Sequence, residues 1–158
     1  MFGARVLAIT SSDEKAGKLR ALGAESVVNY NTFPDWDREI LALTDGKGVD
    51  KVIDVAGGKT IAKSAASTKI RGEIAPVGAV GGIGGGLSPA DLLYRSLILA
   101  TSAIVPRTNF EAMLKAMAMQ EMLPVIDRVY PFADYREAYR RIESGNHVGK
   151  VVIDIANC

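Results

Sequence analysis

The stretch Ala4–Leu22, ARVLAITSSDEKAGKLRAL, predicts a β-strand, a short polar turn and an α-helix. Residues 5–9 form a mostly apolar run of the kind that favours a strand. Residues 11–14 (SSDE) then have the Ser-x-x-Glu spacing of a capping box, which opens a helix. Apolar residues recur at helical spacing up to Gly23, and glycine commonly follows a helix end. The stretch is therefore typical of half a βαβ unit.

The remainder of the chain alternates in the same way. Strands are expected at residues 25–30, 49–56, 72–79, 97–104, 125–130 and 150–155, and helices at 34–44, 59–68, 90–94, 109–122 and 135–143. Residues 49–56 (VDKVIDVA) are nearly continuously apolar, which is typical of a strand covered on both faces. Alternating strands and helices of this length predict an α/β domain with a largely parallel sheet.

Composition excludes several classes of protein. The 158 residues contain 19 Lys and Arg against 18 Asp and Glu, so no basic surface suggests nucleic acid. No apolar run approaches the roughly 20 residues that span a bilayer, and the first residues lead directly into a strand rather than a secretion signal. The single cysteine, Cys158, excludes an internal disulfide, so a cytoplasmic protein is expected. The length suits one domain without a linker.

The sequence resembles the medium-chain dehydrogenase/reductase superfamily, which includes zinc alcohol dehydrogenases and quinone reductases. The resemblance rests on the order and spacing of segments that are individually weak. These are FGARVLAITSSDEKAGKLRALGAESVVNY (2–30), GVDKVIDVAGG (48–58), GEIAPVGAVGG (72–82), RTNFEAML (107–114) and YREAYRRIESGNHVGKVVI (135–153). It implies a Rossmann-like, doubly wound, mostly parallel sheet.

The chain also departs from the family pattern. Members place a catalytic domain first, then a strand and a glycine-rich phosphate turn, before the segment that corresponds to Arg5 onward. No G-x-G-x-x-G turn precedes Arg5, so residues 1–158 are expected to be a partial NAD(P)-binding domain that lacks the first strand and the phosphate turn. The glycine-dense segment 81–86 does not fit that register either. It is interpreted as a flexible loop near the nicotinamide end of the cofactor or, alternatively, as a phosphate cradle of its own.

Residues for metal or nucleophilic chemistry are scarce. Zinc sites want three or four thiolate, imidazole or carboxylate ligands, and the chain has one histidine, His147, and one cysteine. The resemblance places the catalytic zinc ligands of alcohol dehydrogenases in the missing domain. We therefore expect no zinc and assign no catalytic residue in this chain, which by itself is expected to be inactive.

Cofactor preference is predicted from the end of the strand at residues 5–9, which corresponds to the second strand of a complete dinucleotide-binding fold. Such a fold binds the adenosine ribose after its second strand, with an acid for a free 2′-hydroxyl or with cations and hydroxyls for a 2′-phosphate. That place holds Thr10, Ser11, Ser12 and Lys15, which favours NADP, with NAD possible. The carboxylates of residues 13 and 14 count against a phosphate. A structural alternative is that Ser11 caps the helix and Lys15 lies on the surface, and both interpretations can hold.

Further candidate residues come from the later strands. The resemblance implies that Val77, Gly78 and Ala79 lie near the nicotinamide, and that Arg107, Asn146 and Lys150 lie on the cofactor side of the cleft. The alternatives are a surface ion pair for Arg107 and a strand-edge position for Lys150. Asp54 interrupts an apolar strand, so its carboxylate must be hydrogen-bonded. It contacts the ribose or caps the following turn.

These observations predict the cofactor-binding portion of an NAD(P)-dependent oxidoreductase of the alcohol dehydrogenase or quinone reductase type. The alternative is a stand-alone nucleotide-binding or interaction module without catalytic activity. Lack of the central first strand would expose the inner edges of residues 5–9 and 49–55, which are expected to pair directly or to receive a strand in a dimer. The opposite edge, Leu97–Ile104, matches the strand through which many family members dimerise, so a homo-oligomer is expected.

Overall fold

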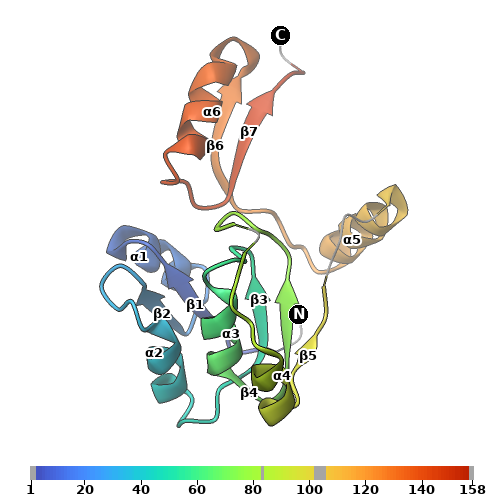
Figure 1. The fold of residues 1–158 in the computed structure, drawn as a ribbon. Coiled ribbons are helices and arrows are strands. Elements are labelled where there is room, and N and C mark those ends of the chain that lie inside the picture. Colours follow the sequence, from blue (N-terminus) through green and yellow to red (C-terminus); the bar gives the residue numbers. More distant parts are fainter. Residues whose placement is uncertain (1–2, 83, 102–105, 157–158) are drawn as a thin grey trace. The chain divides into compact units, whose positions relative to one another are not determined.

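The computed structural model describes residues 3–82, 84–101 and 106–156 (Figure 1). They fall into two compact units, an N-terminal unit of residues 2–106 and a C-terminal unit of residues 107–158. The N-terminal unit contains β1 (Leu7–Thr10), α1 (Asp13–Ala21), β2 (Ser26–Asn29), α2 (Trp36–Leu43), β3 (Val49–Asp54), α3 (Ile61–Ser67), β4 (Thr68–Pro76), α4 (Pro89–Arg95) and β5 (Ile98–Leu99). The C-terminal unit contains α5 (Arg107–Met119), β6 (Ile126–Pro131), α6 (Tyr135–Glu143) and β7 (Lys150–Asp154). The alternation predicted from the sequence is therefore present, and the class is α/β.

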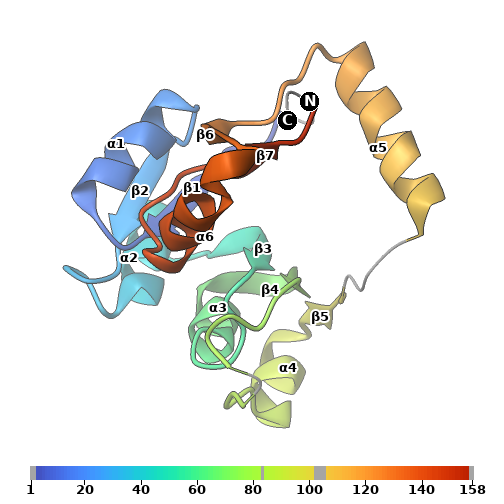
Figure 2. The ribbon, with the colours of Figure 1, turned by 90° about the horizontal axis from the view of Figure 1, so that it is seen from above.

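Every strand pair in the described residues is parallel. β1 pairs with β2, β4 lies between β3 and β5, and β6 pairs with β7. Along the chain, α3 connects β3 to β4 and α4 connects β4 to β5. Figure 2, turned from the first view, shows these two helices apart from β3 and β4. The expectation that residues 5–9 and 49–55 pair directly is wrong, because β1 and β3 belong to separate sheets.

The core of the N-terminal unit lies where α2 packs on the first sheet. Val28, Trp36 and Ile40 form a buried cluster, with Leu7 and Val49 packed against it. Burial of such side chains contributes about 1.5–3 kcal/mol each. β3 is less covered than predicted, because Ile53 is 59% exposed on a strand expected to be buried on both faces. The physical reason is that no described strand occupies the outer edge of β3, so its side chains lack neighbours there.

Side-chain caps mark the starts of α1 and α4, whereas α2, α3 and α6 begin without one. Ser12, not Ser11, is the N-cap of α1, because its Oγ accepts a hydrogen bond from Lys15 N at 3.3 Å. Ser88 caps α4, with Pro89 in the first turn and a reciprocal bond to Asp91. The Ser-x-x-Glu spacing at residues 11–14 thus misplaced the first cap by one residue.

Two strands, β4 and β5, differ most from the predicted ranges. β4 begins at Thr68 rather than Gly72, and its pairing register with β3 shifts just after Val49. Within β4, Arg71 has a positive φ of 61°. The strand ends at Pro76, so residues 77–79 form a loop beyond the sheet. β5 covers only Ile98–Leu99 of the expected strand 97–104, of which residues 102–104 lie outside the described residues.

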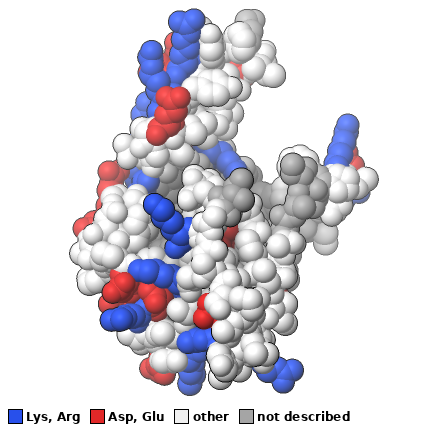
Figure 3. All heavy atoms as spheres, viewed as in Figure 1, with Lys and Arg blue, Asp and Glu red and all other residues white. Residues whose placement is uncertain are grey.

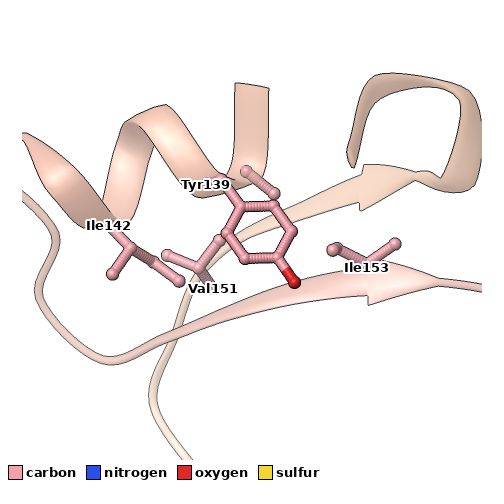
Figure 4. A pocket seen from close by; sticks show the side chains of 5 residues that line it. Tyr139, Ile142, Val151 and Ile153 are labelled. Atoms are coloured by element: carbon pink, nitrogen blue, oxygen red, sulfur yellow. The ribbon is translucent and has the colours of Figure 1, made fainter. Parts of the chain in front are cut away.

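In the C-terminal unit, one amphipathic helix, α6, covers the two parallel strands β6 and β7. Arg141 of α6 donates two hydrogen bonds of 2.9 Å to the carboxylate of Asp127 in β6, which also accepts from Val148 N at 3.0 Å. This carboxylate fixes the helix and the turn before β7 to the same strand. Between α6 and β7, a shallow hollow of about 130 Å³ is lined by Ala138, Tyr139, Ile142, Val151 and Ile153 (Figure 4). It is smaller than the roughly 300–1,000 Å³ of small-molecule sites, so we do not place a ligand there.

Candidate nucleotide-binding site

The four residues predicted to read the ribose lie together at the carboxyl end of β1. Thr10 is the last residue of β1, is 8% exposed, and its carbonyl accepts from Tyr30 N at 2.9 Å. Lys15 Nζ lies 3.3 Å from Ser11 Oγ and donates to it. Ser12 caps α1 and Ser11 meets the lysine, so the helix cap does not use the Ser11 hydroxyl. A hydroxyl and an ammonium thus converge beside the first turn of a helix, where the dipole favours an anion.

Two asparagines at the end of β2 complete this turn and were not predicted. Asn31 Nδ2 donates to the carbonyl of Ser11 at 2.7 Å, and Asn29 Nδ2 donates to Asp13 Oδ1 at 2.9 Å. Asn31 N also donates to Asn29 Oδ1 at 3.1 Å, which links the two asparagines. The signal was available, since Asn-Tyr-Asn directly follows a strand that must lie parallel to β1.

The two carboxylates that counted against a phosphate both have partners. Asp13 accepts from Asn29, and Glu14 Oε1 forms an ion pair with Lys18 Nζ at 2.8 Å. In these contacts, the partner of each carboxylate is a residue other than Ser11. The Lys18 ammonium offsets the charge of Glu14, whereas Asp13 is bonded to a neutral amide and keeps its negative charge. Across the face drawn in Figure 3, Lys and Arg side chains lie among Asp and Glu side chains.

Asp54 organises the turn that follows β3. It is 4% exposed, and its Oδ1 accepts from Ala56 N at 3.0 Å and from Gly57 N at 2.9 Å. Thr60 Oγ1 and Ser64 Oγ donate to the same carboxylate, the latter at 2.7 Å to Oδ2. Burial acts to raise the pKa of Asp54, but the hydrogen bonds from Gly57, Ser64, Thr60 and Ala56 together outweigh it, so the pKa lies below its ordinary value. The geometry favours the cap over a ribose contact.

Val77, Gly78 and Ala79 follow β4 directly and run beside the turn after β3. Val77 N donates to the carbonyl of Asp54 at 2.9 Å. Further along the same loop, Gly81 N donates to the carbonyl of Ala56 at 2.7 Å. The carboxyl ends of parallel strands are where open α/β sheets bind ligands, so this loop is positioned for contact with one.

The other three predicted residues belong to the C-terminal unit. Arg107 begins α5, and its Nε donates to Glu111 Oε1 at 2.7 Å, the surface ion pair named as its alternative. Asn146 accepts from Arg141 Nη2 at 3.2 Å through its main-chain carbonyl. Lys150 is the first residue of β7, where its main-chain N donates to Val125 O at 2.8 Å. Within this unit, Asn146 and Lys150 flank the turn into the last strand.

A zinc site has no support in the part of the chain that the structure describes. No group of three or more His, Cys, Asp or Glu side chains there could hold a metal ion. Its residues do not fit the zinc found in many dehydrogenases, and we assign no step to a metal. In the same described ranges, no helix is both long enough and apolar enough to cross a membrane.

Parallel strands joined by helices, with polar groups gathered at the carboxyl ends, define a Rossmann-like nucleotide-binding fold. Residues 1–119 match the zinc-binding dehydrogenase family, and the chain belongs to that family. A zinc-type alcohol dehydrogenase-like protein of Schizosaccharomyces pombe is 33% identical over 97% of this chain and 45% of its own length. The chain thus spans about half the length of this relative.

Solved structures agree with this assignment. An NAD-dependent alcohol dehydrogenase is 36% identical with a TM-score of 0.86, over 98% of this chain and 45% of that one. Mycobacterial Rv1454c, solved as a complex with NADPH, is 27% identical with a TM-score of 0.78, over 96% of this chain and 50% of that one. The two relatives differ in the cofactor that their descriptions name, so likeness alone does not choose between NAD and NADP.

Proposed function

We propose that this chain is the cofactor-binding portion of an NADP-preferring oxidoreductase of the alcohol dehydrogenase or quinone reductase type, and that residues 1–158 make up part of one NAD(P)-binding domain. The observation that carries the proposal is the convergence of Ser11 Oγ and Lys15 Nζ at the start of α1. An ammonium and a hydroxyl suit a 2′-phosphate, whereas a free 2′-hydroxyl is usually read by an acid that this position lacks.

In this proposal the residues divide by the end of the cofactor they hold. Thr10, Ser11, Ser12 and Lys15 bind the adenosine ribose phosphate. The loop 77–79 holds the nicotinamide end, with Arg107, Asn146 and Lys150 on the cofactor side and Asp54 supporting the turn beside that loop. The bound nicotinamide supplies hydride transfer with an alcohol, aldehyde or enone. This chain's residues bind and orient it, which can contribute much of an enzyme's rate.

The proposed cofactor preference is tested by titrating the chain with NADPH, NADH and 2′,5′-ADP while following amide signals by NMR. We expect NADPH to bind at least about tenfold more tightly than NADH, equivalent to about 1.4 kcal/mol. We also expect 2′,5′-ADP to shift the signals of residues 10–15. Equal affinities would contradict NADP preference, and no binding of any nucleotide would favour the alternative of an interaction module.

We also propose a homo-oligomer that forms through β5. Its two residues, Ile98 and Leu99, are 55% and 43% exposed at one edge of the sheet β3-β4-β5. Exposed apolar edge strands are ready to pair with another chain. A cytoplasmic location also remains a proposal, based on the single cysteine.

A further inference from the structure

The loops after β3 and β4 pack backbone against backbone. Residues 55–58 lie against residues 77–82, and hydrogen bonds join them from Val77 N to Asp54 O and from Gly81 N to Ala56 O, at 2.9 and 2.7 Å. Gly58 is so close to the second loop that an added Cβ would lie 2.7 Å from Gly82 O and 2.8 Å from Gly81 O. Real Cβ atoms do not approach a carbonyl oxygen that closely, so the loops can meet here only because Gly58 has no side chain.

The same closeness singles out two glycines of the second loop. A Cβ added to Gly78 would overlap the carbonyl oxygen of Val55, and a Cβ added to Gly85 would overlap the carbonyl oxygen of Gly58. Gly84 and Gly86, on either side of Gly85, have nothing within 4 Å of such a Cβ. The glycine-dense segment therefore contains positions that must be glycine and neighbours that need not be. We call the contact of residues 55–58 with Gly78, Gly81 and Gly85 the glycine clasp.

Asp54 fixes one side of the clasp. Its buried carboxylate accepts from Ala56 N and Gly57 N, which holds the first loop to the end of β3. The second loop is then held to the first through carbonyls of residues 54 and 56. A rigid sheet end thus determines where the main chain of residues 77–79 lies.

We propose that Gly58 and Gly85 are positioning residues that set the main chain of residues 77–79 for the nicotinamide end of the cofactor. This inference rests on the proposed function. Neither glycine contacts the cofactor in this proposal, and each acts by permitting the close approach of the two loops. A displaced loop would weaken contacts to the nicotinamide half, while the ribose turn at residues 10–15, on another strand, would keep its geometry.

The test compares Gly85→Ala with the matched controls Gly84→Ala and Gly86→Ala. We expect Gly85→Ala to weaken NADPH binding by about tenfold and to change 2′,5′-ADP binding by less than about twofold. The controls should leave both affinities unchanged. Amide exchange supplies a second readout, because the Gly81 amide should exchange faster in Gly85→Ala and remain slow in the controls.

Each other outcome has a defined meaning. Equal loss of NADPH and 2′,5′-ADP in Gly85→Ala would indicate general destabilisation and overturn the inference, as would equal effects in the controls. Failure of the unmodified chain to bind either ligand would instead overturn the proposed function. If Gly85→Ala does not fold, amide exchange measured on the unmodified chain tests the glycine clasp instead. A Gly81 amide as slow as that of Val77 supports the clasp, and exchange at the free-peptide rate overturns it.

Discussion

The side-chain amide of Asn29 donates a 2.9 Å hydrogen bond to the carboxylate of Asp13, joining the end of β2 to the first turn of α1. The same amide group accepts from Asn31 N, whose own side chain holds the carbonyl of Ser11. The turn that meets the proposed 2′-phosphate is therefore held from the neighbouring strand. A neutral donor at residue 29 satisfies Asp13 without adding charge to the turn.

Replacement of this donor by a carboxylate should destabilise the turn. Asn29→Asp places a second negative charge beside Asp13, which costs about 1 kcal/mol for two charges 4 Å apart in water, and removes the hydrogen bond. Urea unfolding at pH 7 measures the loss. The double variant Asp13→Asn with Asn29→Asp restores a donor and an acceptor, so it should recover most of the stability. Equal stability of Asn29→Asp and the unmodified chain would show that the contact contributes nothing.

Cofactor preference should move with the residue at the end of β1. In a full-length relative, Asp at the position of Thr10 is expected to accept hydrogen bonds from a free ribose and to repel a 2′-phosphate. The ratio of NADPH to NADH affinity should then fall by about tenfold or more. Because Thr10 is nearly buried, the ratio rather than either affinity is the measurement, since it cancels a general loss of fold. An unchanged ratio would remove residues 10–15 from ribose recognition.

Asp54 should make stability depend on pH in the acid range. Its pKa is lowered in the folded chain, so its stabilisation is present above the ordinary carboxyl pKa and is lost as pH falls through the folded value. Asp54→Asn cannot accept all of the hydrogen bonds from Gly57, Thr60 and Ser64, and should lower stability at pH 7 by about 1–3 kcal/mol. Unfolding measured from pH 7 to pH 3 should show a smaller acid loss in Asp54→Asn than in the unmodified chain. Parallel pH curves would contradict this account.

Local signals in the sequence predicted much of this fold. The helix at residues 135–143 has the predicted bounds, because its apolar stripe and polar face are strong and it begins after a short turn. The gathering of Thr10, Ser11, Ser12 and Lys15 followed from one strand-turn-helix unit, whose geometry is set by neighbours in the sequence.

Features that depend on distant segments were not predictable in this way. Asn31 reaches Ser11 across 20 residues, and the need for glycine at Gly85 arises from a carbonyl of Gly58, 27 positions earlier. The exposure of β3 was also missed, since an apolar strand predicts burial whether or not a neighbouring strand is present. Arg71 extends β4 through a positive φ that residue type alone does not indicate.

The outer edges of β1 and β3 provide the last prediction. Thr10 O faces β2, where it accepts from Tyr30 N, and main-chain groups alternate along a strand, so the amides of Leu7 and Ile9 point to the opposite edge. No described strand pairs with that edge. We expect the chain to associate by strand donation there, so light scattering at micromolar concentration should give a mass above one chain. The Leu7 and Ile9 amides should exchange more slowly as concentration rises, while Ala8, which faces β2, stays slow throughout and is the internal control. A mass of one chain with fast exchange at Leu7 and Ile9 at every concentration would refute association through this edge.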